Sequence, residues 1–127
     1  WRTGRYRQGW SEKLFGKVPL FSSDQSCVWL HAVSVGEVQL LRTLIEALQH
    51  DYPHLTIALS TTTQTGMELA RRLYPKLACF YMPIDFTWSI RRALDRLNPR
   101  MIILGELEVW PNLISISSQQ QRPVCIV

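Results

Sequence analysis

The sequence predicts an α/β fold in which a parallel β-sheet is covered by helices on both faces. Short apolar runs alternate with segments of helical periodicity, an order typical of β–α–β units with right-handed crossovers. The runs are apolar at consecutive positions, as expected for strands that are buried on both faces. The chain has 127 residues, of which 46% are hydrophobic and 19% charged, enough for one domain with a sizeable core. These observations together indicate a Rossmann-like α/β sandwich.

Strands are predicted where the apolar runs lie, at residues 28–33, 55–60, 78–82, 101–104 and 124–127. Helices are predicted between them from apolar residues at helical spacing, at residues 37–50, 65–74, 86–97 and 111–118. This order contains no internal repeat. It divides the chain into an N-terminal arm and linker at residues 1–26 and a Rossmann-like domain at residues 27–127.

Residues at the ends of the predicted helices support these boundaries. A proline follows each of the first three helices: Pro53, Pro75 and Pro99. The pattern Thr65-x-x-Glu68 predicts a capping box at the second helix, and Asp85 is expected to cap the third. Pro111 suits the first turn of the fourth helix.

The N-terminal arm carries the whole net charge of +4, because residues 18–127 hold equal numbers of acidic and basic residues. Its basic residues are Arg2, Arg5, Arg7, Lys13 and Lys17, and they alternate with Trp1, Tyr6, Trp10 and Phe15. Basic and aromatic residues together suit an anionic membrane surface, where rings lie at the headgroup level, or a nucleic acid, where rings stack on bases. A solvated arm that packs on a further domain is an equal alternative.

Several functional classes lack their sequence signals. The three cysteines, Cys27, Cys79 and Cys125, contain no Cys-x-x-Cys pair, which favours reduced thiols and disfavours a metal site. No apolar stretch approaches the roughly 20 residues of a membrane-spanning helix. The Gly-x-Gly-x-x-Gly, Walker A, His-Glu-x-x-His and Gly-x-Ser-x-Gly motifs are absent from the sequence. A dinucleotide-dependent dehydrogenase is therefore disfavoured.

Polar side chains follow the first four predicted strands, at residues 34–37, 60–66, 83–85 and 106–112. The carboxyl ends of parallel strands meet at one edge of the sheet, where open α/β sheets bind their ligands. His31 precedes the first of these segments but lies inside the strand pattern, so we interpret it as a core histidine. The sequence thus predicts a functional site at the carboxyl edge.

The pattern Ser34-x-x-Glu37 has two interpretations. It matches a capping box, in which both side chains satisfy N–H groups of a helix N-terminus. Alternatively, Glu37 is a general base, although a helix N-terminus favours the ionised carboxylate and so weakens it as a base. A second carboxylate nearby would oppose that effect. The local pattern favours the capping box.

Glu106 and Glu108 supply candidate second carboxylates, since residues two apart on extended backbone share one face. The structural alternative pairs one of them with an arginine such as Arg42 or Arg71 and uses the other as a helix cap. The threonine-rich segment offers hydroxyls and N–H groups for phosphate or sugar oxygens, or simple caps and turns.

The order of four segments resembles the N-terminal domain of the Kdo (3-deoxy-D-manno-octulosonic acid) transferases of lipopolysaccharide synthesis. The segments are His-Ala-Val-Ser-Val-Gly-Glu (31–37), Ser-Thr-Thr-Thr-Gln-Thr-Gly (60–66), Tyr-Met-Pro-Ile-Asp (81–85) and Glu-Leu-Glu-Val-Trp-Pro-Asn (106–112). The resemblance spans nearly the whole chain. It implies the GT-B fold, in which two Rossmann-like domains flank a cleft, and it makes this chain the acceptor-side half of a longer enzyme, inactive alone.

The resemblance also implies a reaction: transfer of Kdo from CMP-Kdo, held by the C-terminal domain, to a lipid A precursor with inversion. It assigns Glu37 as the general base and Glu106 as the transition-state stabiliser. Residues expected to contact substrate are Ser34, Gly36, Thr62, Thr63 and Glu108. Arg2, Arg5 and Arg7 would contact acceptor phosphates or the anionic surface of the inner membrane, on its cytoplasmic face. No metal, no other cofactor and no nucleic-acid partner is implied.

Two other hypotheses remain. The chain could belong to a different GT-B glycosyltransferase that uses a nucleotide-sugar donor. It could also be a non-catalytic Rossmann-like binding module in which the carboxylates are only helix caps.

Overall fold

The computed structural model of this chain describes residues 18–21, 25–105 and 110–127. Arg2, Arg5 and Arg7 of the predicted arm, and the two glutamates Glu106 and Glu108, lie outside the described residues. All the predicted strands and helices, and Glu37, lie within them.

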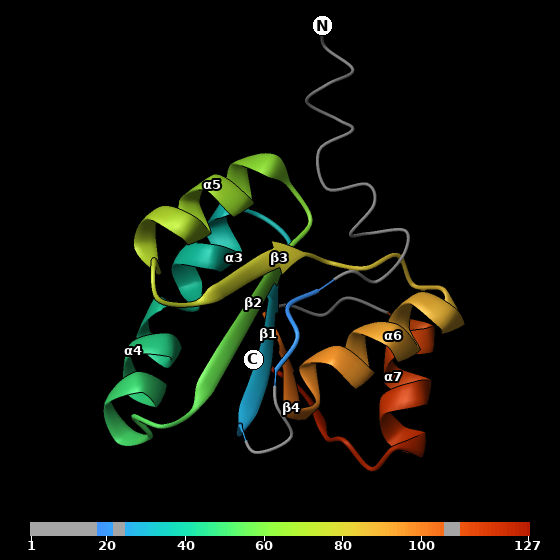
Figure 1. The fold of residues 1–127 in the computed structure, drawn as a ribbon. Helices are drawn as coiled ribbons and strands as arrows, with labels where there is room; N and C mark the ends of the chain where they lie inside the picture. Colours follow the sequence, from blue (N-terminus) through green and yellow to red (C-terminus); the bar gives the residue numbers. More distant parts are fainter. Residues whose placement is uncertain (1–17, 22–24, 106–109) are drawn as a thin grey trace, which may run out of the picture.

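The described residues form a parallel sheet of five strands, which confirms the predicted α/β class (Figure 1). The strands are β1 (Cys27–Ala32), β2 (Thr56–Thr61), β3 (Ala78–Tyr81), β4 (Pro99–Leu104) and β5 (Val124–Ile126). Their order is β3-β2-β1-β4-β5, and every neighbouring pair is parallel. Strands β2 and β3 are added on one side of β1, and the chain then crosses over to add β4 and β5 on the other side. The carboxyl ends of β1 and β4 therefore form the topological switch point of the sheet.

Helices cover both faces of the sheet (Figure 1). One face carries α3 (Val35–Leu40), α4 (Arg42–Asp51) and α5 (Gln64–Leu73), and the other carries α6 (Thr87–Leu97) and α7 (Pro111–Gln119). Side chains of β1 alternate between the two cores: Trp29 packs with α6 and α7, and Leu30 packs with α3, α4 and α5. Burial on both faces explains why the strands are continuous apolar runs.

The first predicted helix, at residues 37–50, is two helices in the structure, and it begins earlier than predicted. Helix α3 starts at Val35, directly after the cap residue Ser34, before the apolar periodicity becomes visible at Val38. Leu41 separates α3 from α4, but its N–H still donates to Glu37 O, and its carbonyl accepts from Ile45 N. The interruption is thus one residue that keeps its helical hydrogen bonds.

The capping box predicted at Thr65 and Glu68 is wrong. The N-cap of α5 is Thr63, whose Oγ1 accepts a hydrogen bond from the N–H of Gly66 at 3.0 Å. Thr65 lies inside the helix, and Glu68 accepts from Gln64 on its exposed face. Four threonine or serine residues precede this helix, and the position at which the strand ends decides which one becomes the cap.

The prediction that Asp85 caps α6 is also wrong, because Phe86 is the N-cap of that helix. The Asp85 carboxylate instead accepts from the N–H groups of Asn112 and Leu113, each at 2.9 Å. The Asn112 side-chain amide donates back to the carbonyl of Asp85. Asp85 thus caps α7, a neighbour in space that lies far along the chain, and a carboxylate is favourable at that helix N-terminus.

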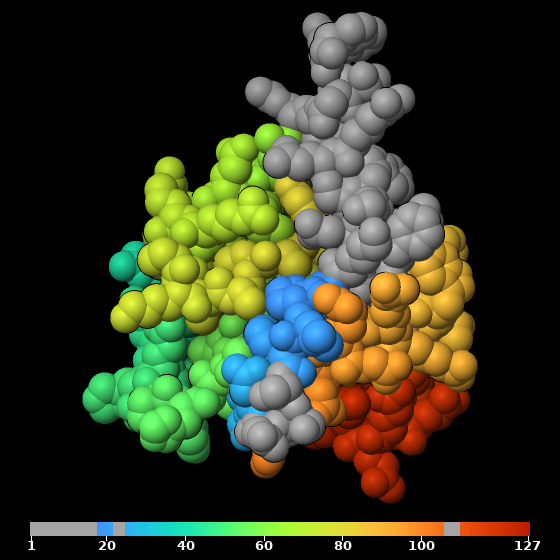
Figure 2. All heavy atoms as spheres, in the orientation of Figure 1, coloured from blue at the N-terminus to red at the C-terminus, as the bar shows by residue number. Residues whose placement is uncertain are grey.

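Residues 18–21, which belong to the predicted arm and linker, pack on the domain. Val18 is buried, its carbonyl accepts from Arg96 Nε at 2.6 Å, and the Phe21 N–H donates to Arg96 O at 3.0 Å. In Figure 2 this segment, in blue, lies between the yellow-green atoms on one side and the orange atoms of α6 on the other. These contacts attach residues 18–21 to helix α6.

Candidate site at the switch point of the sheet

Glu37 lies at the switch point and is only 6% exposed. The backbone N–H of Ser34 donates to Glu37 Oε2 at 3.0 Å, and the Ser34 hydroxyl donates to the same oxygen at 3.2 Å. Ser34 has an extended backbone and is the N-cap of α3, so the capping-box interpretation is confirmed. Both hydrogen bonds use Oε2.

The end of β4 lies directly against Glu37. The Gly105 N–H donates to His31 O at 2.8 Å, which extends the pairing of β1 and β4 by one residue. A Cβ added at Gly105 would lie 3.1 Å from His31 O and 3.8 Å from Glu37 Cβ, so a glycine permits this close approach. The residue after Gly105 is Glu106. The structure therefore brings Glu37 beside the chain position that precedes the second predicted catalytic carboxylate.

The threonine-rich segment after β2 also lies at this edge. A Cβ added at Gly66 would lie 3.6 Å from the carbonyl carbon of Ser34 and 2.8 Å from Thr63 Oγ1. Thr63 uses its hydroxyl to cap α5, whereas Thr62 is half-buried. At Gly36, in contrast, an added Cβ would meet no described atom within 4 Å. The described residues thus leave the first turn of α3, which carries Glu37, open at Gly36.

The structure connects three strand residues that the sequence analysis did not link. Ser60 Oγ accepts from Trp29 Nε1 at 2.8 Å and lies 2.8 Å from His31 Nδ1. The other acceptors near this hydroxyl are farther away, at 3.5 Å (Leu30 O) and 3.8 Å (Met82 Sδ). We therefore assign the Ser60 proton to the bond with Nδ1, which leaves the ring proton of His31 on Nε2.

His31 is 2% exposed, which confirms the prediction of a core histidine. Burial lowers its pKa from 6.5 to about 4, because the charged imidazolium loses its hydration. Its ring contacts Trp110 edge to face, with centroids 5.5 Å apart and an interplanar angle of 86°. Within the described part of the chain, neither His31 Nε2 nor Trp110 Nε1 has a hydrogen-bond partner. The sequence signal that could have linked these residues is a polar side chain near the carboxyl end of each strand, His31 in β1 and Ser60 in β2, which pair in the sheet.

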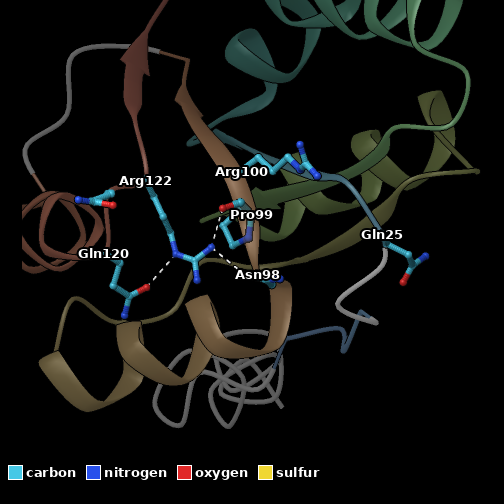
Figure 3. Close-up of a pocket in the computed structure, with 7 residues that line it drawn as sticks. Gln25, Asn98, Pro99, Arg100, Gln120 and Arg122 are labelled. Atoms are coloured by element: carbon cyan, nitrogen blue, oxygen red, sulfur yellow. Dashed lines mark hydrogen bonds between the residues drawn. The ribbon is translucent and has the colours of Figure 1, made fainter.

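A hollow of about 550 Å³ lies at the opposite edge of the sheet, where the strands begin. Figure 3 shows that Arg122 points into its lining toward Gln120 and Pro99, whereas Arg100 and Gln25 extend away from Arg122. The Arg122 guanidinium donates to Gln120 Oε1, Asn98 Oδ1 and Pro99 O at 2.8, 3.1 and 2.7 Å. These bonds tie the ends of α6 and α7 to the start of β4, and burial lowers the pKa of Arg122. Arg122 therefore has a structural role.

Among residues 18–21, 25–105 and 110–127, no cluster of His, Cys, Asp or Glu has the arrangement of a metal site. Over the same residues, every helix is too short or too polar to cross a membrane. The parallel sheet, its switch point and the buried carboxylate together define a Rossmann-like domain with an acidic site where this class binds ligands.

Comparison with known proteins identifies the family. A sequence profile described as 3-deoxy-D-manno-octulosonic-acid transferase (Kdo transferase) matches residues 8–127. The chain therefore belongs to the Kdo transferase family, as the resemblance implied.

Curated relatives agree with this family. A 3-deoxy-D-manno-octulosonic acid transferase of Haemophilus influenzae is 38% identical over 119 residues, which cover 89% of this chain and 27% of that protein. A Bordetella pertussis protein of the same name is 38% identical over 106 residues, which cover 79% of this chain and 24% of that protein. A bifunctional glycosyltransferase/methyltransferase of Fusobacterium nucleatum is 31% identical over 107 residues, or 82% of this chain and 17% of that protein. The chain thus spans about a quarter of the length of the two named transferases.

Proposed function

We propose that the protein containing this chain transfers Kdo from CMP-Kdo to a lipid A precursor with inversion, and that this chain is its acceptor-side domain. The family match over residues 8–127 carries the proposal. The position of Glu37, buried at the switch point beside open space, supports it. We propose no resident metal or cofactor for this reaction, in which CMP on the donor is the leaving group.

In the proposed mechanism, Glu37 removes the proton from a sugar hydroxyl of the acceptor as that oxygen attacks the anomeric carbon of Kdo. The bond from this carbon to CMP breaks, and CMP leaves with the bonding electron pair. The transition state has oxocarbenium character, as in glycoside chemistry. Glu106, which follows Gly105 in the chain, would stabilise the developing positive charge.

Capping and proton transfer are compatible in this arrangement. Both Ser34 donors bind Oε2 of Glu37, and we propose that Oε1 accepts the proton of the acceptor hydroxyl. The bonds to Ser34 would orient the carboxylate, and the open space at Gly36 would admit the sugar. Ser34, Gly36, Thr62, Thr63 and Glu108 remain the proposed substrate contacts.

A direct assay tests the proposal. The full-length protein is incubated with CMP-Kdo and a lipid A precursor, and the lipid product is analysed by mass spectrometry. We expect the lipid to gain the mass of one or more Kdo residues, with release of CMP. Failure of a folded full-length protein to transfer Kdo to this acceptor would contradict the proposed reaction.

We propose that an anionic membrane surface, the cytoplasmic face of the inner membrane, is the second partner. Arg2, Arg5 and Arg7 are the arm residues that would contact it. Helix α6 offers a further basic and aromatic face: Phe86 and Trp88 are each 49% exposed, and Arg91 and Arg92 are exposed beside them. Such a combination suits phospholipid headgroups.

Vesicle binding tests the membrane partner. Replacing Arg2, Arg5 and Arg7 together by serine is expected to weaken binding to phosphatidylglycerol vesicles by about 3 kcal/mol at low salt, since each arginine near the surface contributes about 1 kcal/mol. Serine at Arg91 and Arg92 should weaken it further. The matched control is serine at Arg71 and Arg72, an exposed pair on α5, with binding measured by vesicle sedimentation. Equal binding of the arm variant and the wild type would exclude this role.

A second candidate is a different glycosyltransferase with a nucleotide-sugar donor. The match to the Fusobacterium nucleatum protein favours keeping it, because that protein is named a glycosyltransferase without a stated sugar. Offering the full-length protein other nucleotide sugars in the same assay distinguishes the two. Transfer from such a donor, without transfer from CMP-Kdo, would support the second candidate.

A further inference from the structure

His31 contacts the described residues on both sides of the segment that carries Glu106 and Glu108. Its carbonyl accepts from the Gly105 N–H at 2.8 Å, and its ring packs edge to face against Trp110. Gly105 in turn approaches Glu37 Cβ, as its hypothetical Cβ would lie 3.8 Å from that atom. His31 therefore contacts both Gly105, which follows β4, and Trp110, which precedes α7, and Gly105 lies between His31 and Glu37.

The His31 ring is itself firmly held. Nδ1 is bonded to Ser60 Oγ at 2.8 Å, and Ser60 is held by Trp29 Nε1 at the same distance. All three side chains are at most 2% exposed. Close packing and the bond between Nδ1 and Ser60 Oγ hold the ring in this orientation.

Trp110 depends on this ring for its placement. Its indole Nε1 has no hydrogen-bond partner within the described residues, so packing against the core and the contact with His31 fix the indole. An edge-to-face contact is directional, because the positive ring edge meets the negative face. Removal of the imidazole ring would take away that directional contact.

We propose that His31 is a positioning residue, whose carbonyl fixes Gly105 and whose ring fixes Trp110 relative to Glu37. It touches neither substrate nor leaving group. This inference rests on the proposed transferase function. Its effect would appear in the chemical step, because misplacement of a reacting group by about 1 Å can cost about 100-fold in rate.

Two substitutions separate positioning from stability. His31→Asn keeps a polar atom near the place of Nδ1, and thus the bond to Ser60, but it loses the ring against Trp110. His31→Phe keeps a ring against Trp110 but leaves the Ser60 hydroxyl without its nearest acceptor, His31 Nδ1. We therefore expect His31→Asn to be the more stable protein and His31→Phe the more active one. A purely structural residue would show the same order in both measurements.

The experiment measures kcat, KM and Tm of the full-length protein with CMP-Kdo and a lipid A precursor. We expect His31→Asn to lower kcat by about 10- to 100-fold with KM for both substrates within about twofold, and His31→Phe to retain most of kcat. Trp110→Leu should have a kcat similar to that of His31→Asn, and Trp110→Phe should have a kcat similar to that of the wild type. If His31→Phe does not fold, these two Trp110 variants test the inference in its place. Ser117→Ala, at a fully buried serine of α7, is the control that leaves kcat unchanged.

Three results would overturn the inference: an unchanged kcat in His31→Asn, a raised KM with an unchanged kcat, or activities that follow the order of Tm. Each presupposes an active wild-type protein. If the wild type itself does not transfer Kdo, the proposed function fails instead, so the two failures are distinguishable.

Discussion

Glu37→Gln is expected to reduce Kdo transfer by the full-length protein by about 100- to 10,000-fold, the range typical of removing a general base. Glutamine cannot accept the proton of the acceptor hydroxyl. Its amide oxygen can still accept from Ser34 N, and glutamine is as acceptable as glutamate in a capping box. The fold should therefore remain, and kcat should fall at unchanged Tm.

Glu68→Gln is the matched control, since Glu68 is an exposed glutamate on the neighbouring helix α5. It should transfer Kdo at the wild-type rate. If Glu37→Gln were as active as this control, Glu37 would be only a helix cap. If Glu37→Gln were both inactive and unfolded, the loss of activity would be due to the loss of the fold. The Tm and activity of Glu37→Asp would then separate the role of Glu37 as a helix cap from its role as a general base.

Acidification from pH 6.5 to pH 4 is expected to remove about 3 kcal/mol of folding stability through His31 alone. The unfolded chain binds a proton at this histidine below pH 6.5, whereas burial lowers the pKa in the folded protein to about 4. The contribution is therefore fully present above pH 6.5 and is lost as the pH falls through this interval. Urea unfolding at pH 6.5 and pH 4.5 measures most of it.

Carboxylates also titrate toward the lower end of this range, so the comparison uses variants. His31→Asn should lose less stability on acidification than the wild type, because it has no imidazole to protonate. His54→Asn, at an exposed histidine, should retain the wild-type dependence. The same pH dependence in His31→Asn and the wild type would show that His31 is not the responsible group.

Much of the fold could be predicted from the sequence because the strands are buried on both faces. That burial makes residues such as Ile102 and Ile103 part of a continuous apolar run, which is visible without any structure. Prolines act through the local backbone, and the helices α4, α5 and α6 each end just before the proline that predicted their end. The Ser34–Glu37 capping box is local as well, with both partners within one helical turn.

The wrong predictions concern side chains that had a choice of partners. Asp85 stands next to one helix in the chain but caps another, because α6 and α7 are neighbours on the same face of the sheet. Thr63, not Thr65, is the cap of α5 because β2 extends to Thr61. Local patterns identify a residue that is able to cap, but not which helix end lies within its reach.

The sequence by itself determined the α/β class, the carboxyl edge as the place of the polar residues, and the family, since each depends on local periodicity or on motifs in order. Only the tertiary structure decided that β1 lies between β2 and β4, which creates the switch point and brings Glu37 against Gly105. It also decided that Trp29, Ser60 and His31 form one buried chain. The physical reason is that strand order and side-chain contacts arise from the packing of distant segments, which periodicity within a single segment does not encode.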